Sequence, residues 1–187
     1  MILETIVTSR NIDGSINVSP MGATVSVDES RFELRPFDTS TTYLNLKRTR
    51  EGILHITDDV DLIARAAIGE LLELPPLVPG RVVDVPALAT ACRWYEFKVD
   101  FIDDSGPRIG LNCQTLHQHR HRDFVGFNRA KHAVLESAIL ATRLNFLPFD
   151  EVREQFQRFA LIVDKTGGPQ EHAAFQLLQE FVATHQQ

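Results

Sequence analysis

Cysteine and long apolar runs are both scarce in this sequence. The 187 residues include only Cys92 and Cys113, and no Cys-x-x-Cys pair. We therefore expect two reduced cysteines that pack in strands of a cytoplasmic protein. No run is long and apolar enough to span a bilayer, which predicts a protein without a membrane segment. The first ten residues do not contain a basic segment followed by an apolar one, so we expect no secretory signal.

Positive charge is also in deficit. Nineteen lysines and arginines face 25 acidic residues, for a net charge of −6. This balance argues against a surface built for duplex nucleic acid, although it leaves room for a local anion site. The Gly-x-Gly-x-x-Gly signature of nicotinamide nucleotide binding, the Gly-x-Ser-x-Gly motif of serine hydrolases and convincing carboxylate pairs are all missing.

The patterns that are present predict strands followed by helices. Hydrophobic residues make up 43% of the chain, enough for a substantial core. Two-residue alternation and turn signals predict strands over residues 3–9, 16–27, 31–37, 52–57, 91–102 and 108–119, with a hairpin turn at 104–107. Caps and stripes predict helices after Asp38 or Thr39, over 60–72 and 128–144, after Asp150, and from Pro169. A proline-rich connector occupies residues 73–90. This order indicates an α+β fold, with helices packed on an antiparallel barrel.

The stretch INVSPMG, residues 16–22, is the first candidate site. Pro20 has no amide and interrupts the hydrogen-bond ladder on one side of its strand. Gly22 allows another molecule to approach the backbone, and Met21 is polarizable and suits contact with aromatic rings. Asn17 and Ser19 add short hydrogen-bonding groups. The stretch suits the edge of a planar heterocycle, and the alternative is an ordinary kinked strand.

A second candidate site lies at the predicted start of a short helix. Ser40, Thr41 and Thr42 supply hydroxyl groups where free amides and the helix dipole favour an anion. The alternative is simple N-capping. A ring-edge site followed by a strand and a hydroxyl-rich helix start is the layout that a flavin mononucleotide needs.

The sequence resembles a known family at these positions. The order N-V-S-P-M-G, R-P-F and T-S-T-T-Y-L-N-L resembles the flavin reductase-like, FMN-binding split barrels. More closely it resembles an uncharacterised archaeal and bacterial group of such barrels with a helical C-terminal part. That group carries a helix start similar to residues 126–136, G-F-N-R-A-K-H-A-V-L-E. The resemblance reaches about Leu147, and it is close over the first 60 residues and this helix.

The resemblance implies an antiparallel split β-barrel over residues 1–126 and a helical subdomain over 127–187 packed on it. It also implies a homodimer with FMN near the subunit interface, and NAD(P)H or another compound as electron donor. Arg129 would be a charge partner of the phosphate, unless it belongs to a solvated, salt-bridged face with His132, Glu136 and Arg143. The implied FMN-binding residues are Asn17, Val18, Ser19, Pro20 and Met21 at the ring, and Ser40, Thr41, Thr42 and Arg129 at the phosphate.

Three histidines form the last candidate site. In a strand, His117, His119 and His121 would share one face. Two of them could hold a zinc ion with a ligand from elsewhere, but the favoured alternative is a polar strand end without metal. Arg120 and Arg122 beside them could help to hold the FMN phosphate or an acidic substrate.

Three functions follow from these sites. The first is a flavin-dependent oxidoreductase, in which the flavin carries the redox chemistry and no catalytic side chain is identified. The second is an FMN-binding or assembly protein without turnover. The third is a zinc-dependent hydrolase built on the three histidines.

Overall fold

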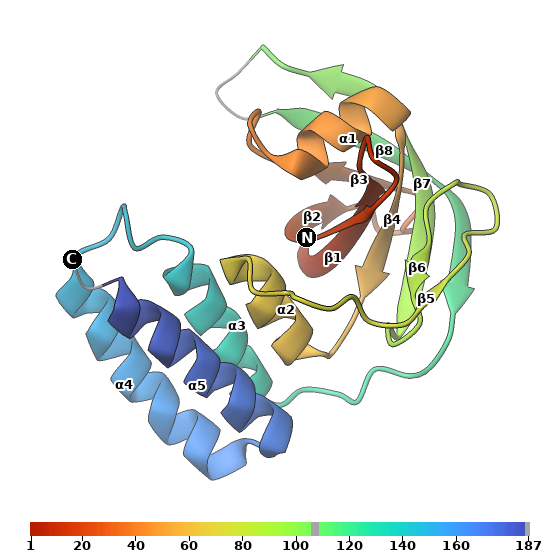
Figure 1. Ribbon diagram of the computed structural model, residues 1–187. Coiled ribbons are helices and arrows are strands. Elements are labelled where there is room, and N and C mark those ends of the chain that lie inside the picture. Colours follow the sequence, from red (N-terminus) through yellow and green to blue (C-terminus); the bar gives the residue numbers. More distant parts are fainter. Residues whose placement is uncertain (106–108, 186–187) are drawn as a thin grey trace. The chain divides into compact units, whose positions relative to one another are not determined.

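The computed structural model describes residues 1–105 and 109–185, and within it the chain forms two compact units (Figure 1). The first unit comprises Met1–Thr57 and Leu74–Phe124. The second comprises Asp58–Glu73 and the residues from Val125 onward. The chain therefore leaves the first unit twice.

The first unit is a closed antiparallel barrel, which confirms the α+β fold class. Its six strands follow one another around the barrel in the order β1 (Ile2–Arg10), β2 (Ile16–Val25), β3 (Arg31–Leu34), β8 (Gly110–Arg120), β7 (Arg93–Asp103) and β4 (Glu51–Ile56). Helix α1 (Thr41–Thr49) and a hairpin of β5 (Leu77–Val78) and β6 (Ala87–Leu88) complete the unit. β3 ends two residues before Pro36, which cannot donate to a ladder. The predicted turn at 104–107 falls partly outside the described residues.

Apolar side chains from every barrel strand and from α1 fill the barrel. Phe32 and Phe97 meet edge to face, with 5.0 Å between ring centroids. A Cβ at Gly52 would lie 2.6 Å from the Phe97 ring, so only glycine fits there. The buried residues of this core are Val7, Ala23, Phe32, Leu34, Tyr43, Leu46, Leu54, Tyr95, Phe97, Val99, Ile109, Leu111 and Cys113.

The connector over residues 73–90 is anchored by buried polar groups of the barrel strands. The Glu96 carboxylate, only 1% exposed, accepts the backbone N–H groups of Arg81, Val82 and Val83 at 2.6–3.2 Å. His55 is fully buried and lies 3.1 Å from the Ile6 carbonyl through Nδ1. Its Nε2 accepts the Leu88 N–H, so Nδ1 must carry the proton and donate to Ile6.

The second unit consists of four helices. Asp59 and Asn128 cap two of them by accepting an N–H three residues on, and Pro169 opens the last helix as expected. The predicted cap at Asp150 is wrong: that helix begins one residue earlier, after Pro148, and has no side-chain cap. The helices are α2 (Val60–Ile68), α3 (Arg129–Ala141), α4 (Phe149–Thr166) and α5 (Pro169–Thr184).

Helix α2 packs against α3 and α5, whereas the sequence placed residues 60–72 with the barrel. The helix stops at Ile68 rather than at 72, because Gly69 takes a left-handed conformation with φ of 77° and ends it. Lys131 joins the helices by donating to Glu171 at 2.6 Å and to the Asp58 carbonyl at 2.8 Å. The division into domains 1–126 and 127–187 stays a prediction.

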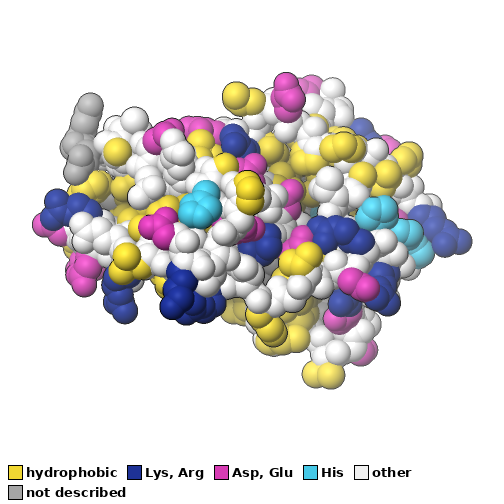
Figure 2. Space-filling view, turned by 90° about the horizontal axis from the view of Figure 1, so that it is seen from below, with side chains coloured by type: hydrophobic (Ala, Val, Ile, Leu, Met, Phe, Trp, Pro, Cys, Tyr) yellow, Lys and Arg dark blue, Asp and Glu magenta, His cyan; other side chains and the backbone are white. Residues whose placement is uncertain are grey.

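Two observations concern the helices and the surface of the described residues. No helix among them has the length and apolar character needed to cross a membrane. On the face shown in Figure 2, acidic, basic and hydrophobic side chains are interspersed.

We expect the free energy of unfolding to fall between pH 6.5 and pH 4. Burial lowers the pKa of His55 from 6.5 to about 4, so the unfolded chain binds one more proton than the folded chain in this range. The stability that neutral His55 contributes is complete above pH 6.5 and is lost as the pH falls through 4. Between pH 7 and 4.5 the loss is roughly 2–3 kcal/mol.

Denaturant unfolding at several pH values measures this loss. In His55→Gln the component assigned to His55 should disappear, because glutamine does not titrate. An equally steep dependence in the variant would contradict the assignment.

Candidate functional site

The strand that carries the first candidate site has one open edge. β2 pairs with β1 from Ile16 to Thr24. On its other side it pairs with β3 only at residues 23–25. Among the described residues, no strand covers this second edge of β2 over residues 16–22.

The register shows which backbone groups face that open edge. The Val25 N–H donates to the Met1 carbonyl, so the odd-numbered residues of β2 bond to β1. The backbone groups of Val18, Pro20 and Gly22 consequently point away from β1. Pro20 has no N–H, so its position on the outward side leaves the β1 ladder intact. The edge offers N–H groups at Val18 and Gly22, and carbonyls at all three residues.

The two candidate segments meet through a pair of side chains. The Asn17 amide donates to Thr42 Oγ1 at 3.0 Å and to Ser9 Oγ at 3.3 Å. Asn45 of α1 donates to the same Ser9 hydroxyl at 3.1 Å and to Asn11 at 2.7 Å. This network fastens the start of α1 to β1 and β2. It also means that the amide nitrogen of Asn17 already has acceptors within the protein.

The start of α1 combines capping with free amides. Ser40, rather than the expected Asp38 or Thr39, is the N-cap: its hydroxyl accepts the Tyr43 N–H at 3.2 Å and donates to the Phe37 carbonyl at 2.8 Å. The N-cap alternative is therefore correct for Ser40. Thr41 and Thr42 are the first two residues of the helix, where N–H groups have no partner within the helix. The Thr41 side chain is exposed, and that of Thr42 is buried.

The remaining residues of the first candidate site divide between the two faces of β2. Met21 packs, partly buried, against the barrel core, so its side chain points to the inside of the barrel. Ser19 lies on the same face as Met21, and its hydroxyl donates to the Pro20 carbonyl at 3.4 Å. Val18 and Pro20 are half-buried and point to the opposite face.

Arg129 is the first residue of α3, in the second unit, and its side chain is exposed. On the same helix, His132 and Glu136 lie 3.9 Å apart, which favours a salt-bridged face. The role of Arg129 at a phosphate stays a prediction.

The three histidines do not converge on a metal position. His119 stacks on Trp94 with 4.3 Å between ring centroids, and His121 lies 6.4 Å from His119. β8 ends at Arg120, and a bulge near Leu116 changes the side on which residues point. In the described part of the chain, no group of three or more His, Cys, Asp or Glu side chains is placed to hold a metal ion. The zinc hydrolase hypothesis therefore has no structural support.

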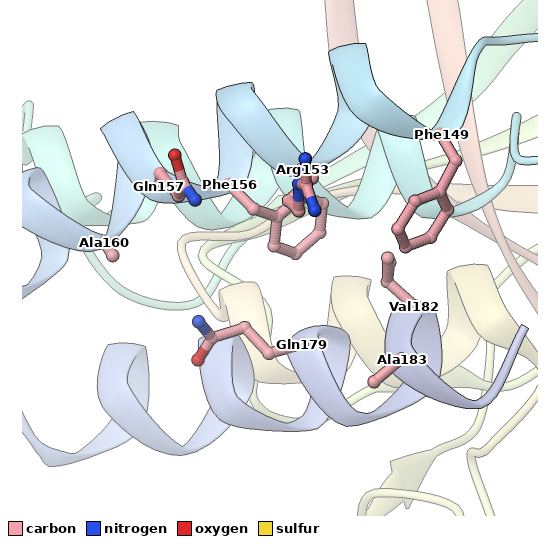
Figure 3. A pocket seen from close by; sticks show the side chains of 8 residues that line it. All are labelled: Phe149, Arg153, Phe156, Gln157, Ala160, Gln179, Val182 and Ala183. Carbon is pink, nitrogen blue, oxygen red and sulfur yellow. The ribbon is translucent and has the colours of Figure 1, made fainter. Parts of the chain in front are cut away.

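A cavity of about 290 Å³ lies between α4 and α5 (Figure 3). Phe156 and Arg153 project from α4, and Val182 and Gln179 from α5. Its lining is mainly apolar, and none of these residues was predicted from the sequence as part of a site.

The roles of Glu96 as the anchor of the connector and of His55 as a buried hydrogen-bonding group were not predicted from the sequence. The available signal was a polar residue within a strand of large apolar ones, since such residues need buried partners.

We expect Asn17 and Thr42 to be energetically coupled. In a double-mutant cycle of Asn17→Ala and Thr42→Val, the coupling free energy should be about 1 kcal/mol, the usual net value of one buried hydrogen bond. Asn17→Ala combined with Thr41→Val is the matched control, because Thr41 is exposed, and its coupling should be near zero. Equal coupling in both cycles, measured by denaturant unfolding, would show that the contact does not join α1 to β2.

Comparison with known proteins places this architecture in a family. The N-terminal domain of the family described as protein of unknown function (DUF447) matches residues 3–122, and the C-terminal part of the same family matches residues 128–180. No curated protein matches the chain.

Solved structures share the fold. An FMN-bound DUF447 protein from Methanosarcina mazei has a TM-score of 0.82 at 22% identity, over 96% of this chain and 94% of its own. The 2-nitrobenzoate 2-nitroreductase of Pseudomonas fluorescens has a TM-score of 0.54 at 18% identity, over 63% of this chain and 64% of its own. An FMN-binding protein from Thermus thermophilus has a TM-score of 0.53 at 16% identity, over 64% of this chain and 70% of its own. The two matches of the family cover most of the sequence, and the chain belongs to the DUF447 family.

Proposed function

We propose that this protein binds FMN along the open edge of β2, with the phosphate at the start of α1. The observation that carries the proposal is the unpaired backbone edge over residues 16–22. The contact between Asn17 and Thr42 supports it, because it joins the two segments that the ring and the phosphate need. The FMN bound to the Methanosarcina mazei protein of the same family gives independent support.

The groups on this edge suit a flavin ring. The ring edge carries both hydrogen-bond donors and acceptors, and an unpaired strand edge offers the complementary N–H and C=O groups. Val18 and Gly22 supply N–H donors. Pro20 supplies only its carbonyl as an acceptor, because proline has no N–H. Because Gly22 is exposed and has no side chain, a ligand can approach the backbone there.

The start of α1 suits the phosphate. The N–H groups of Thr41 and Thr42 and the positive end of the helix dipole favour a dianion. The exposed Thr41 hydroxyl adds a further donor. Ser40 and Thr42 hold this turn in place through their own hydrogen bonds. In this proposal Arg129 is an additional charge partner.

A homodimer completes the proposed site. An unpaired strand edge is a surface that proteins usually cover. A second copy of the chain placed over the ring would cover the edge and exclude water from the flavin. The dimer is thus part of the proposal, and it accounts for an edge that no strand of the described residues covers.

The proposed activity is oxidoreduction, with NAD(P)H or another compound as electron donor. Bound FMN supplies hydride and electron transfer, so the protein's task is to hold and shield the ring. Residues 17–22 and 40–42 contain no titratable side chain, which suits a site that moves no proton of its own. The alternative, an FMN-binding protein without turnover, uses the same residues.

We expect the apoprotein to bind FMN and turn yellow, with a dissociation constant in the micromolar range or below. Val18→Pro removes an outward N–H, and Pro20 shows that the barrel accepts proline at an equivalent position of the register. This variant should bind FMN about tenfold more weakly, which is the effect of losing one hydrogen bond.

Val18→Ala is the matched control, because it keeps the N–H and should bind within about threefold of the parent chain. No binding by the parent chain at tens of micromolar, or equal affinity of the two variants when both remain folded, would contradict the proposal.

We expect NADH or NADPH to bleach the visible absorbance of the bound flavin under anaerobic conditions, faster than the same concentration of free FMN. The measurement is stopped-flow absorbance with the FMN-loaded protein. If neither nucleotide nor a panel of other donors reduces the bound flavin, the protein binds FMN without turnover, and the oxidoreductase proposal fails.

A further inference from the structure

A cavity of about 360 Å³ in the barrel unit takes no part in the proposed function. It lies where β7 begins and β8 ends. Its lining is dominated by arginine and includes Arg93, Arg120, Arg122, Gln118, Asp123 and Phe124.

The strand register places two of these arginines side by side. Arg93 of β7 pairs with Arg120 of β8. Tyr95, two residues after Arg93, belongs to the barrel core, so Arg93 points to the same inner face. The cavity is therefore one mouth of the barrel, and two guanidinium groups lie on adjacent strands at its rim.

Hydrogen bonds hold these guanidinium groups in place. Arg93 donates to the Tyr95 hydroxyl at 3.2 Å and lies 3.4 Å from the Glu29 carboxylate. Burial, followed by the Glu29 carboxylate, raises the pKa of Tyr95 to about 12. The hydroxyl therefore stays protonated and donates a hydrogen bond to the Glu29 carboxylate. Arg122 donates to the Thr90 carbonyl at 3.0–3.1 Å. These two arginines are thus preorganised without a ligand.

Arg120 is held differently. Its partner is Asp123, three residues on, and both side chains are more than 70% exposed. An exposed ion pair of this kind contributes little and is easily exchanged. Asp123 therefore occupies the position of an acceptor that an incoming anion can replace.

The guanidinium groups themselves suit such an exchange. They stay protonated at all physiological pH values, so the positive charge on each arginine is permanent. An oxyanion between Arg93 and Arg120 could accept bidentate hydrogen bonds from both.

We propose that this mouth of the barrel binds a small oxyanion, the phosphate or carboxylate group of a small molecule, through Arg93, Arg120 and Arg122. The site does not depend on flavin binding, since none of its residues belongs to the open edge of β2 or to α1. It would give the protein a means of recognising an acidic substrate or effector.

The chain contains its own reporter for this site. Trp94 is the only tryptophan in the sequence. It is adjacent to Arg93, and its ring stacks on His119, the neighbour of Arg120. An anion that reorders these arginines should therefore change the fluorescence of Trp94.

The test is a titration of the full chain, freed of flavin, with inorganic phosphate or with succinate, at constant ionic strength set by chloride. We expect a saturable change in Trp94 fluorescence with at least one of the two anions, at low millimolar concentration or below, and calorimetry should give the same affinity. Saturation by phosphate alone would identify a phosphate site, and saturation by succinate alone a carboxylate site.

Two variants test the residues. Arg120→Gln should weaken anion binding about tenfold or more, because it removes a charge-assisted contact. Arg158→Gln, at an exposed position on α4, removes the same charge elsewhere and should leave the affinity unchanged. No saturation of the parent chain by either anion would overturn the proposal, whether or not the variants fold. Equal weakening by both variants would also overturn it, because the effect would then be one of net charge. FMN binding by the same preparations should be unaffected, which keeps the two proposals separable.

Discussion

The structure depends on a strand that is only partly paired. β2 is bound to β1 along its length, and β3 completes the barrel over just three of its residues. Closing the barrel at residues 23–25 while leaving 16–22 open creates an edge of backbone donors and acceptors on a rigid scaffold. Pro20 suits this edge because its missing N–H faces outward, where no ladder needs it. The proposed flavin site follows from this one constraint.

Buried polar contacts fix the segments around that strand. Asn17 and Thr42 tie the first turn of α1 to β2, so the helix start and the strand edge keep a defined spacing. On β7, Glu96 gathers three backbone N–H groups of the connector, a strong arrangement because a charged acceptor meets several donors at once. The edge of β2 over residues 16–22 has no such contact from a strand of the described residues.

Much of the fold could be predicted from the sequence, since alternation and caps are local signals. The six barrel strands and the helices that begin near residues 60 and 128 were predicted from such signals. Other features depend on tertiary contacts. The anchoring role of Glu96 is set by residues 13 to 15 positions away, and the packing of α2 against α3 and α5 cannot be read from its own amphipathic pattern. The cap at Asp150 was wrong because the helix begins at Phe149, directly after Pro148, so that Asp150 lies within its first turn.

The two candidate segments could be picked out from the sequence, and the direction of their side chains could not. Asn17 contacts Thr42, and Met21 packs on the core. The central claim is that the backbone edge itself receives the ring. Amide hydrogen exchange of Val18 and Gly22, with and without FMN, tests it most directly. We predict that both amides exchange fast in the apoprotein and slow strongly with FMN, while Ser19, already bonded to β1, changes little. Unchanged exchange at Val18 and Gly22 in FMN-saturated protein would contradict the account.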